Sequence, residues 1–207
     1  DHLVACVTAA KETLGKGYGM AVDAGPGYLP HDALRFARAL EPLHLLWIED
    51  MITGDYSPFV NPDVYRDVTH ATTTPIHTGE QIYLRQNYKA LIESHAVNVV
   101  GPDPCDVGGI AELKWIAEHA DLHGIAMAPH GTANGIFGLA SLIQVCATLP
   151  DNLIAFEYPA RFEPFWYDIT EGFDGMPVKG GLIDVPDRPG LGVNLIAKEA
   201  KKYLSEG

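Results

Sequence analysis

The sequence predicts an α/β fold, a parallel (β/α) barrel that is incomplete and has about six strand–helix units. Three observations lead to this prediction. Short apolar runs without polar alternation recur along the chain, as expected of strands buried on both faces. Amphipathic stretches lie between them, and this alternation is typical of parallel βα units. A carboxylate or a histidine ends each run, at intervals of 26, 31, 23, 27 and 27 residues, about one βα unit each.

The elements follow in order along the chain. The six predicted strands cover residues 19–23, 45–49, 75–80, 97–100, 125–128 and 153–157. The predicted helices cover residues 3–14, 32–40, 61–70, 85–95, 108–123 and 135–148. Pro30 precedes the second helix, and Asn61 with Pro62 offers an N-cap and a first-turn proline for the third. The first helix has no strand before it.

The last part of the chain changes character after Gly172. Turns and short extended pieces, such as 180–186 and 189–193, are followed by a charged terminal helix. We therefore expect residues 1–172 to form the partial barrel, a catalytic domain, and residues 173–207 to form a C-terminal tail. The chain begins at Asp1 without a methionine, so we expect a processed or truncated product.

Composition excludes some classes of partner. The chain of 207 residues carries a formal net charge of −13 and no basic run, so nucleic acid and anionic membrane surfaces are not expected partners. Anionic small molecules remain open, because a bound divalent cation can invert the local charge. No apolar run reaches the ~18 residues of a membrane span. Cys6, Cys105 and Cys146 form no CxxC motif, which favours reduced thiols and a cytoplasmic protein.

The residues that end the six runs are all chemically capable. They are Asp23, Glu49, Glu80, Asp103, His130 and Glu157. In a closed parallel barrel the carboxyl ends of the strands converge on one mouth, where barrel enzymes do their chemistry. Acids at strand ends can instead cap the next helix or face water, but capping alone would use Ser, Thr and Asn as often. The recurrence in successive units favours a shared pocket.

The first three of these acids predict a metal site. Asp23, Glu49 and Glu80 cannot lie close together unneutralised, since like charges at ~4 Å repel by several kcal/mol. Either their pKa values rise or a cation binds. Three carboxylates with open positions suit one Mg²⁺ ion per active site, and without a Cys/His ligand set there we do not expect zinc.

The next two residues predict a catalytic dyad. An aspartate such as Asp103 beside His130 would fix the imidazole tautomer and raise its basicity. The other eight histidines are expected to have structural roles, although His77 lies in a strand near Glu80 and could line the pocket. The remaining candidates for substrate contact, each with an ordinary surface or packing role as the alternative, are Tyr28, Tyr83 and Arg85.

These residues in this order resemble the enolase superfamily, in its mandelate racemase/muconate lactonizing enzyme branch. The matching motifs are Val22-Asp23, Trp47-Ile48-Glu49-Asp50, Thr78-Gly79-Glu80, Pro102-Asp103 with Gly108-Gly109-Ile110, Ala128-Pro129-His130-Gly131, Phe156-Glu157 and Pro189-Gly190-Leu191-Gly192. The resemblance implies a barrel of the enolase C-terminal type, with Asp23, Glu49 and Glu80 as Mg²⁺ ligands. It also implies Asp103 and His130 as the dyad, with His130 as general acid/base, and Glu157 as the acid that hydrogen-bonds the developing oxyanion.

The reaction that the resemblance implies is Mg²⁺-dependent abstraction of a proton α to a carboxylate, through an enediolate. The histidine dyad looks most like that of the acid-sugar dehydratases, the galactonate and mannonate dehydratase-like enzymes. These hydro-lyases convert an acid sugar to a 2-keto-3-deoxy acid. A racemase or cycloisomerase of the same superfamily is the first alternative. A fragment without activity, acting only as a structural or partner-binding half-barrel, is the second.

The chain departs from the family pattern in two ways. The family barrel needs seven or eight strands, so the first two strands and an α+β capping domain are expected to be absent. The family's Lys-x-Lys pair lies on the second of these strands, so this sequence does not show whether the full-length parent has it. The tail would pack on that capping domain, and the isolated chain is expected to be inactive or weakly active. Gly25 stands where some sugar-acid dehydratases have a histidine. A homo-oligomer is expected of the full-length parent.

Overall fold

Five short parallel strands form one sheet within the part of the chain that this computed structural model describes, residues 2–52, 60–131, 135–172 and 178–204. They are β1 (Val22–Asp23), β2 (Ile48–Glu49), β3 (Ile76–Thr78), β4 (Val99–Val100) and β5 (Ala126–Met127). Each strand pairs in parallel with the next one along the chain. The predicted parallel α/β class is confirmed.

The sixth predicted strand, 153–157, is not a regular strand. It lies beside β5, with one isolated parallel bridge between Met127 and Leu153. Ile154 N–H donates to the Met127 carbonyl at 2.9 Å, and Glu157 N–H donates to the Pro129 carbonyl at 3.0 Å. The next hydrogen bond of a regular ladder would be donated by residue 129. Pro129 has no N–H, so regular pairing stops there. The prediction of six strands is therefore corrected to five plus one bridged segment.

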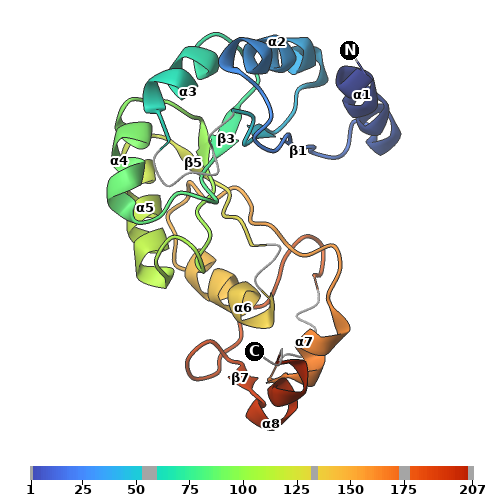
Figure 1. Cartoon of the computed structure of the whole chain (residues 1–207), viewed down its shortest axis with the longest axis vertical. Helices are drawn as coiled ribbons and strands as arrows, with labels where there is room; N and C mark the ends of the chain where they lie inside the picture. The colour runs from blue at the N-terminus through green and yellow to red at the C-terminus, as the bar shows by residue number, and fades with distance from the viewer. Residues whose placement is uncertain (1, 53–59, 132–134, 173–177, 205–207) are drawn as a thin grey trace.

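Helices cover the outer side of the sheet (Figure 1), and all but the first of them come after a strand. They are α1 (His2–Leu14), α2 (Pro30–Leu40) with the short η1 (Glu41–Leu43), α3 (Pro62–Thr69), α4 (Arg85–Glu93), α5 (Ile110–Leu122) and α6 (Gly135–Cys146). Asn61 caps α3 as predicted, because its side chain accepts the N–H of Asp63 at 3.1 Å and Pro62 opens the first turn.

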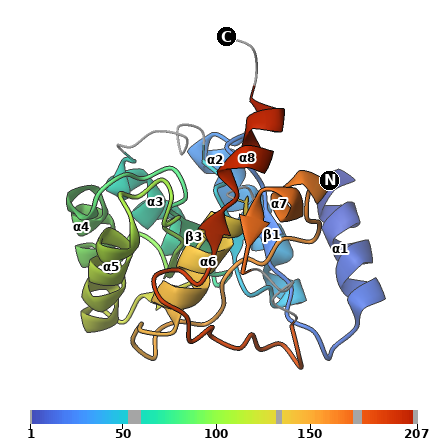
Figure 2. The same ribbon diagram turned by 90° about the horizontal axis from the view of Figure 1, so that it is seen from below.

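The main core lies between the sheet and these helices. It includes strand residues Ile48, Ile76, Val100 and Met127 and helix residues Ala33, Leu40, Leu91, Leu113, Ile116 and Leu142, all 1% exposed or less. The helix α1 differs from the others, since none of its residues is buried. Figure 2 shows α1 and the α4–α5 pair on opposite sides of the molecule. The core thus fixes the sheet, and the carboxyl ends of its strands, in one rigid layer.

The tail packs against α6 where the structure describes it. The region before the tail ends with α7 (Pro164–Asp168) and β6 (Thr170–Glu171), and the tail holds β7 (Asn194–Leu195), the charged helix α8 (Ala197–Ala200) and η2 (Lys201–Tyr203). Strands β6 and β7 pair antiparallel across the predicted border at residue 172. The Gln144 side-chain amide donates to the Pro186 carbonyl at 3.0 Å, and Val193 is buried beside Ile136 and Leu139. Residues 173–177 and 205–207 of the predicted tail lie outside the described residues.

None of the helices in the described ranges is long and apolar enough to cross a membrane.

Candidate active site

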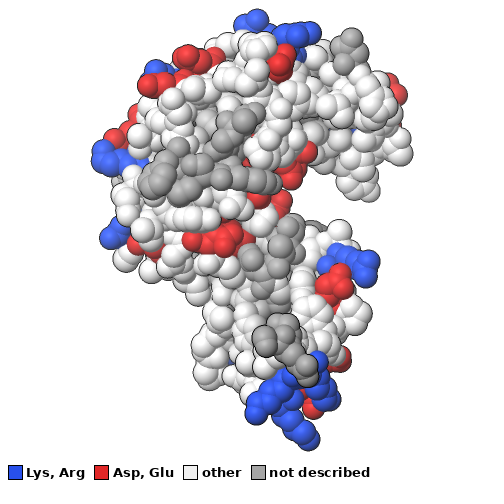
Figure 3. Space-filling view, viewed as in Figure 1, with Lys and Arg blue, Asp and Glu red and all other residues white. Residues whose placement is uncertain are grey.

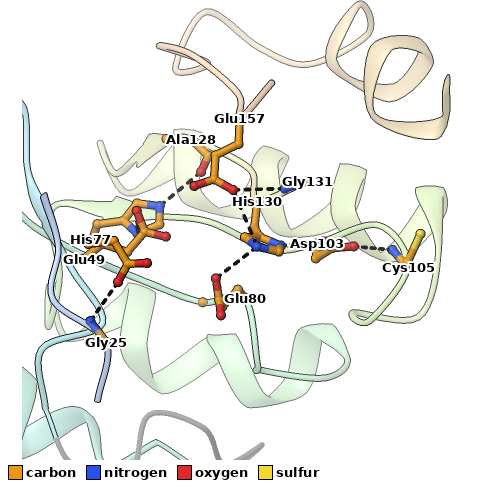
Figure 4. A network of polar contacts seen from close by, with 12 residues as sticks. Gly25, Glu49, His77, Glu80, Asp103, Cys105, Ala128, His130, Gly131 and Glu157 are labelled. Carbon is orange, nitrogen blue, oxygen red and sulfur yellow. Dashed lines mark hydrogen bonds and ion pairs between the residues drawn. The ribbon is translucent and has the colours of Figure 1, made fainter. Parts of the chain in front are cut away.

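The strand register places the candidate residues at one edge of the sheet. Asp23, Glu49 and His77 stand side by side on β1, β2 and β3. Glu80, Asp103 and His130 follow the ends of β3, β4 and β5 by two or three residues. Figure 4 shows His130 between Glu80, Glu157 and Asp103, with Glu49 and His77 together at one side. The predicted convergence of strand ends is what the structure shows.

Asp103 and His130 form a hydrogen-bonded pair. His130 Nδ1–H donates to Asp103 Oδ2 at 2.6 Å, and the backbone N–H of Cys105 donates to Asp103 Oδ1 at 2.7 Å. Asp103 is fully buried, so its carboxylate has little freedom to turn. A carboxylate bound to Nδ1–H fixes the imidazole tautomer and leaves Nε2 to exchange a proton. The pair therefore orients Nε2 toward the mouth of the sheet.

The Nε2 atom of His130 faces two further carboxylates. It lies 3.2 Å from Glu80 Oε2 and 3.5 Å from Glu157 Oε2. Glu157 also accepts the N–H of Gly131 at 3.2 Å. Burial alone would lower the pKa of His130, but the Asp103 hydrogen bond and the charges of Glu80, Glu157 and Asp103 raise this pKa to about 9. Without a bound cation these carboxylates therefore keep His130 as an imidazolium near pH 7, and a cation that neutralised Glu80 would lower this pKa toward the range of a base.

Glu49 is held in a buried polar pocket. The indole N–H of Trp47 donates to Glu49 Oε2 at 2.9 Å, and His77 Nδ1 lies 3.4 Å from the same oxygen. Burial raises the pKa of Glu49 to about 7; the Trp47 hydrogen bond opposes this rise, and the charges of Glu157, Asp23 and Glu80 add to it. Burial likewise raises the pKa of Glu80. Glu49 is therefore short of compensating positive charge, whereas the charge of His130 opposes the rise at Glu80.

His77 lies against Glu49 in this pocket. Its Nε2–H donates to the Ala128 carbonyl at 3.1 Å, and its ring stacks on Trp47 with 5.4 Å between centroids. Burial lowers the pKa of His77 to about 4, so the ring is neutral near pH 7. With Nε2 as the donor, Nδ1 presents a lone pair toward Glu49. His77 thus lies buried beside Glu49, and its role in lining the substrate pocket stays a prediction.

The carboxylates fit a hard divalent cation. Oxygens of Glu49, Asp50 and Glu80 all lie within 4.8 Å of one another. Asp23 stands in register with Glu49, and its Oδ1 accepts the Gly25 N–H at 2.8 Å. Carboxylate oxygens are the ligands that Mg²⁺ prefers. The structure therefore groups Glu49 with Glu80 and places Asp23 on the next strand.

Asp50 is the residue that sequence reasoning missed. It is 2% exposed and has a φ of 44°, which turns its side chain to the same side as that of Glu49 rather than to the opposite face. Strand alternation predicts that consecutive side chains point apart, so Asp50 was not expected in the site. The Glu49-Asp50 doublet at the end of a buried run was the signal available in the sequence.

Glycines allow the strand ends to approach each other. Gly79 has a φ of +146°, and an added Cβ would lie 3.0 Å from the backbone nitrogen of Gly101. The buried Tyr88 hydroxyl donates to the Gly79 carbonyl at 2.5 Å and holds this turn. Glu80 follows immediately, so this contact fixes the direction from which its carboxylate enters the site.

The candidate substrate contacts lie elsewhere in the structure. Tyr28 stacks on Phe36 of α2, with 5.2 Å between ring centroids. The Arg85 guanidinium lies 3.9 Å from the ring centroid of Trp115 on α5. Tyr83 is exposed, and its carbonyl accepts a hydrogen bond from the Asn87 side chain at 2.6 Å. These contacts correspond to the packing and surface roles that the sequence left as alternatives.

The surface at the site is hollowed and acidic. Figure 3 shows Asp and Glu atoms gathered along the hollow between the upper part of the molecule, with α1 and α2, and the lower part, with α7 and α8. Because the carboxylates at the strand ends repel one another, this hollow favours a cation over an anion. An anionic substrate would need that cation bound first.

Comparisons with known proteins point to one family. The family described as "Enolase C-terminal domain-like" matches residues 1–200. D-xylonate dehydratase of Haloferax volcanii is 35% identical over 207 residues, which is 100% of this chain and 48% of that protein. This chain thus spans about half the length of the curated relatives it matches.

Solved structures agree with this assignment. A mandelate racemase/muconate lactonizing enzyme-like protein from Rubrobacter xylanophilus superposes with a TM-score of 0.86 at 35% identity, covering 99% of this chain and 50% of that one. An enolase from Pantoea ananatis with bound D-gluconate and Mg superposes with a TM-score of 0.83 at 26% identity, covering 95% of this chain and 46% of that one.

Proposed function

The chain belongs to the enolase C-terminal domain-like family, and from this premise we propose that it carries the acid/base half of an acid-sugar dehydratase. The reaction is removal of a proton α to the substrate carboxylate, followed by loss of the β-hydroxyl as water. The enol that results tautomerises to a 2-keto-3-deoxy acid. The observation that carries this proposal is His130 Nε2, oriented by Asp103 and facing the carboxylates of Glu80 and Glu157.

A divalent cation completes the proposed site. Glu49 and Glu80 would hold Mg²⁺ together with Asp23, the ligand inferred from sequence, and Asp50 lies close enough to hold or orient the same ion. When bound, Mg²⁺ withdraws charge from the substrate carboxylate and so makes the α-proton more acidic. The indole N–H of Trp47 keeps Glu49 in place for this role through its hydrogen bond to Oε2.

The chain's own residues move the protons. His130 Nε2 accepts the α-proton, and Asp103 stabilises the imidazolium that forms. His130 then returns a proton to the departing β-hydroxyl, which leaves as water. Glu157 lies on the other side of His130 Nε2 and would hydrogen-bond the substrate oxygen on which charge develops, the role that the family resemblance implies for it. One imidazole can serve both steps, because it takes one proton from the α-carbon and delivers one proton to the leaving hydroxyl.

The substrate class is tested with a panel of acid sugars, including D-xylonate and D-gluconate. We expect at least one to yield a 2-keto-3-deoxy acid at a low rate, detected as a new carbonyl, because the isolated chain is expected to be weakly active at most. A racemase or cycloisomerase, favoured by the name of the Rubrobacter structure, would exchange the α-proton with solvent deuterium without forming a 2-keto-3-deoxy acid. A protein that neither exchanges the proton nor forms the carbonyl would be the inactive half-barrel, and the proposal would be wrong.

Magnesium is expected to stabilise the fold. An ion that binds the native carboxylate cluster and not the unfolded chain stabilises by about 2.7 kcal/mol at ~100 times its Kd, or about 5–10 °C in melting temperature for a chain of this size. Glu80→Gln should remove most of this shift. The control Glu12→Gln changes an exposed glutamate of α1 and should retain it. Equal shifts in both variants would place the ion elsewhere.

We also propose that the tail packs on a capping domain and that the full-length parent is a homo-oligomer. They rest on the resemblance and on the half-length coverage of the relatives.

A further inference from the structure

A second group of metal-binding side chains lies on the outer surface, at the carboxyl ends of α4 and α5. His119 lies in the last turn of α5, His123 is its C-cap, and Glu93 ends α4. Residues four apart on a helix share one face, so the two imidazoles stand one above the other. Helices of a parallel βα unit end on the side of the sheet opposite its strand ends. This group is therefore separate from the Asp103–His130 site.

The three side chains already lie at distances close to those of a metal site. His119 Nε2 is 3.6 Å from Glu93 Oε1, and one ligand atom from each of Glu93, His119 and His123 lies within 4.8 Å of the others. In tetrahedral zinc sites with bonds of about 2.0–2.1 Å, ligand atoms are about 3.3–3.4 Å apart. Small side-chain rotations would therefore close the group around one ion.

One buried nitrogen of this group lacks a hydrogen bond within the described part of the chain. His119 Nε2 is buried and makes no hydrogen bond with any residue that the structure describes. A buried polar atom without a hydrogen bond is unfavourable for the folded state. Glu93 turns its other oxygen, Oε2, to Lys89 Nζ at 2.6 Å, so its Oε1 is the one that faces His119. A metal ion between them would satisfy the histidine nitrogen and the carboxylate oxygen together.

A third histidine stands beside the group. The His95 ring lies 6.2 Å from the His123 ring, measured between centroids, and the His119 and His123 rings are 4.8 Å apart. His95 follows α4 in the left-handed region, with a φ of 51°. Its position two residues after Glu93 places a fourth nitrogen donor within reach of the same region.

We propose that Glu93, His119 and His123 bind a Zn²⁺ ion that clamps the ends of α4 and α5 together. Imidazole nitrogen suits zinc, whereas the all-carboxylate mouth suits magnesium, so the two sites select different ions. The helices are neighbours in Figures 1 and 2 and contact each other directly, so one ion can bridge them. An ion bound only by the folded chain stabilises it by mass action.

The test is isothermal titration of the chain with ZnCl₂ at about pH 7.5, where free imidazole is neutral. Millimolar MgCl₂ is kept in the buffer to occupy the carboxylate mouth. We expect one zinc ion per chain and a rise in melting temperature. His119→Ala and His123→Ala should each weaken this binding by about 100-fold or more, because loss of even an outer-shell partner costs roughly 10–100-fold.

A matched control separates this site from other histidines. His2→Ala removes a histidine whose ring nitrogen lies 3.7 Å from Cys6 Sγ, the same four-residue spacing on α1, and should leave the zinc affinity unchanged. Melting curves without zinc check that each variant folds. Zinc affinity equal to wild type in both His119→Ala and His123→Ala, or no zinc binding by the wild-type chain, would overturn the proposal.

Discussion

Replacing His130 with asparagine is expected to lower exchange of the substrate α-proton by about 10²–10⁴-fold, the usual contribution of a general acid–base group. Asparagine has similar size and keeps a donor for Asp103, so the fold should survive. It cannot accept a proton at the position of Nε2, which is the atom that faces Glu80 and Glu157 at 3.2 and 3.5 Å. Exchange is measured by NMR in deuterium oxide, with a substrate from the acid-sugar panel.

Two comparisons make the His130 result specific. The Mg²⁺-induced shift in melting temperature should remain in His130→Asn, because the proposed ligands are carboxylates. His44→Asn is the matched control, since His44 is exposed and has a φ of 49°, a conformation that asparagine tolerates. It should exchange at the wild-type rate. Exchange at the wild-type rate in His130→Asn would show that another group takes the proton.

Gly101→Ala is expected to destabilise the fold by about 2–5 kcal/mol, through overpacking and a broken buried hydrogen bond. An added Cβ at Gly101 would lie only 2.3 Å from the His77 ring and 2.9 Å from the Ala128 carbonyl. The ring would have to leave its stack on Trp47 and its bond to Ala128. Urea unfolding followed by circular dichroism measures the loss.

Gly17→Ala is the control for that substitution. An added Cβ at Gly17 meets nothing within 4 Å, and its φ is outside the left-handed region, so its stability should change little. Because Gly101 lies two residues before Asp103, Gly101→Ala should also weaken the Mg²⁺ shift and proton exchange. A variant as stable as the wild type would mean that β3 and β4 can separate at their ends without cost.

The strand ends could be predicted from sequence because two simple patterns coincide there. Burial on both faces makes each strand a short apolar run, and the first residue able to bear charge marks its end. Parallel pairing then brings these ends to one edge, which is how Asp103 and His130 meet although 27 residues separate them. The residue-by-residue roles come from the family resemblance, since spacing alone names no reaction.

Other features needed coordinates. Pro129 interrupts the pairing of 153–157 because it lacks one N–H, a detail that hydrophobicity does not record. Asp50 joins the site through a positive φ, which strand alternation does not anticipate. Arg85 turns to Trp115, a contact between two helices that local sequence does not reveal. Glu93 is a further example. The four-residue spacing of His119 and His123 is visible in the sequence, but only the folded chain brings Glu93 next to them.

The hydrogen bond from the Trp47 indole to Glu49 has a practical consequence. Indole fluorescence responds to charge placed next to the ring nitrogen, so this tryptophan is an intrinsic optical label on the carboxylate pocket. The other two tryptophans, Trp115 on α5 and Trp166 on α7, lie on different elements. Events at Glu49 can therefore be followed by light emission in the unmodified protein, without attaching a dye.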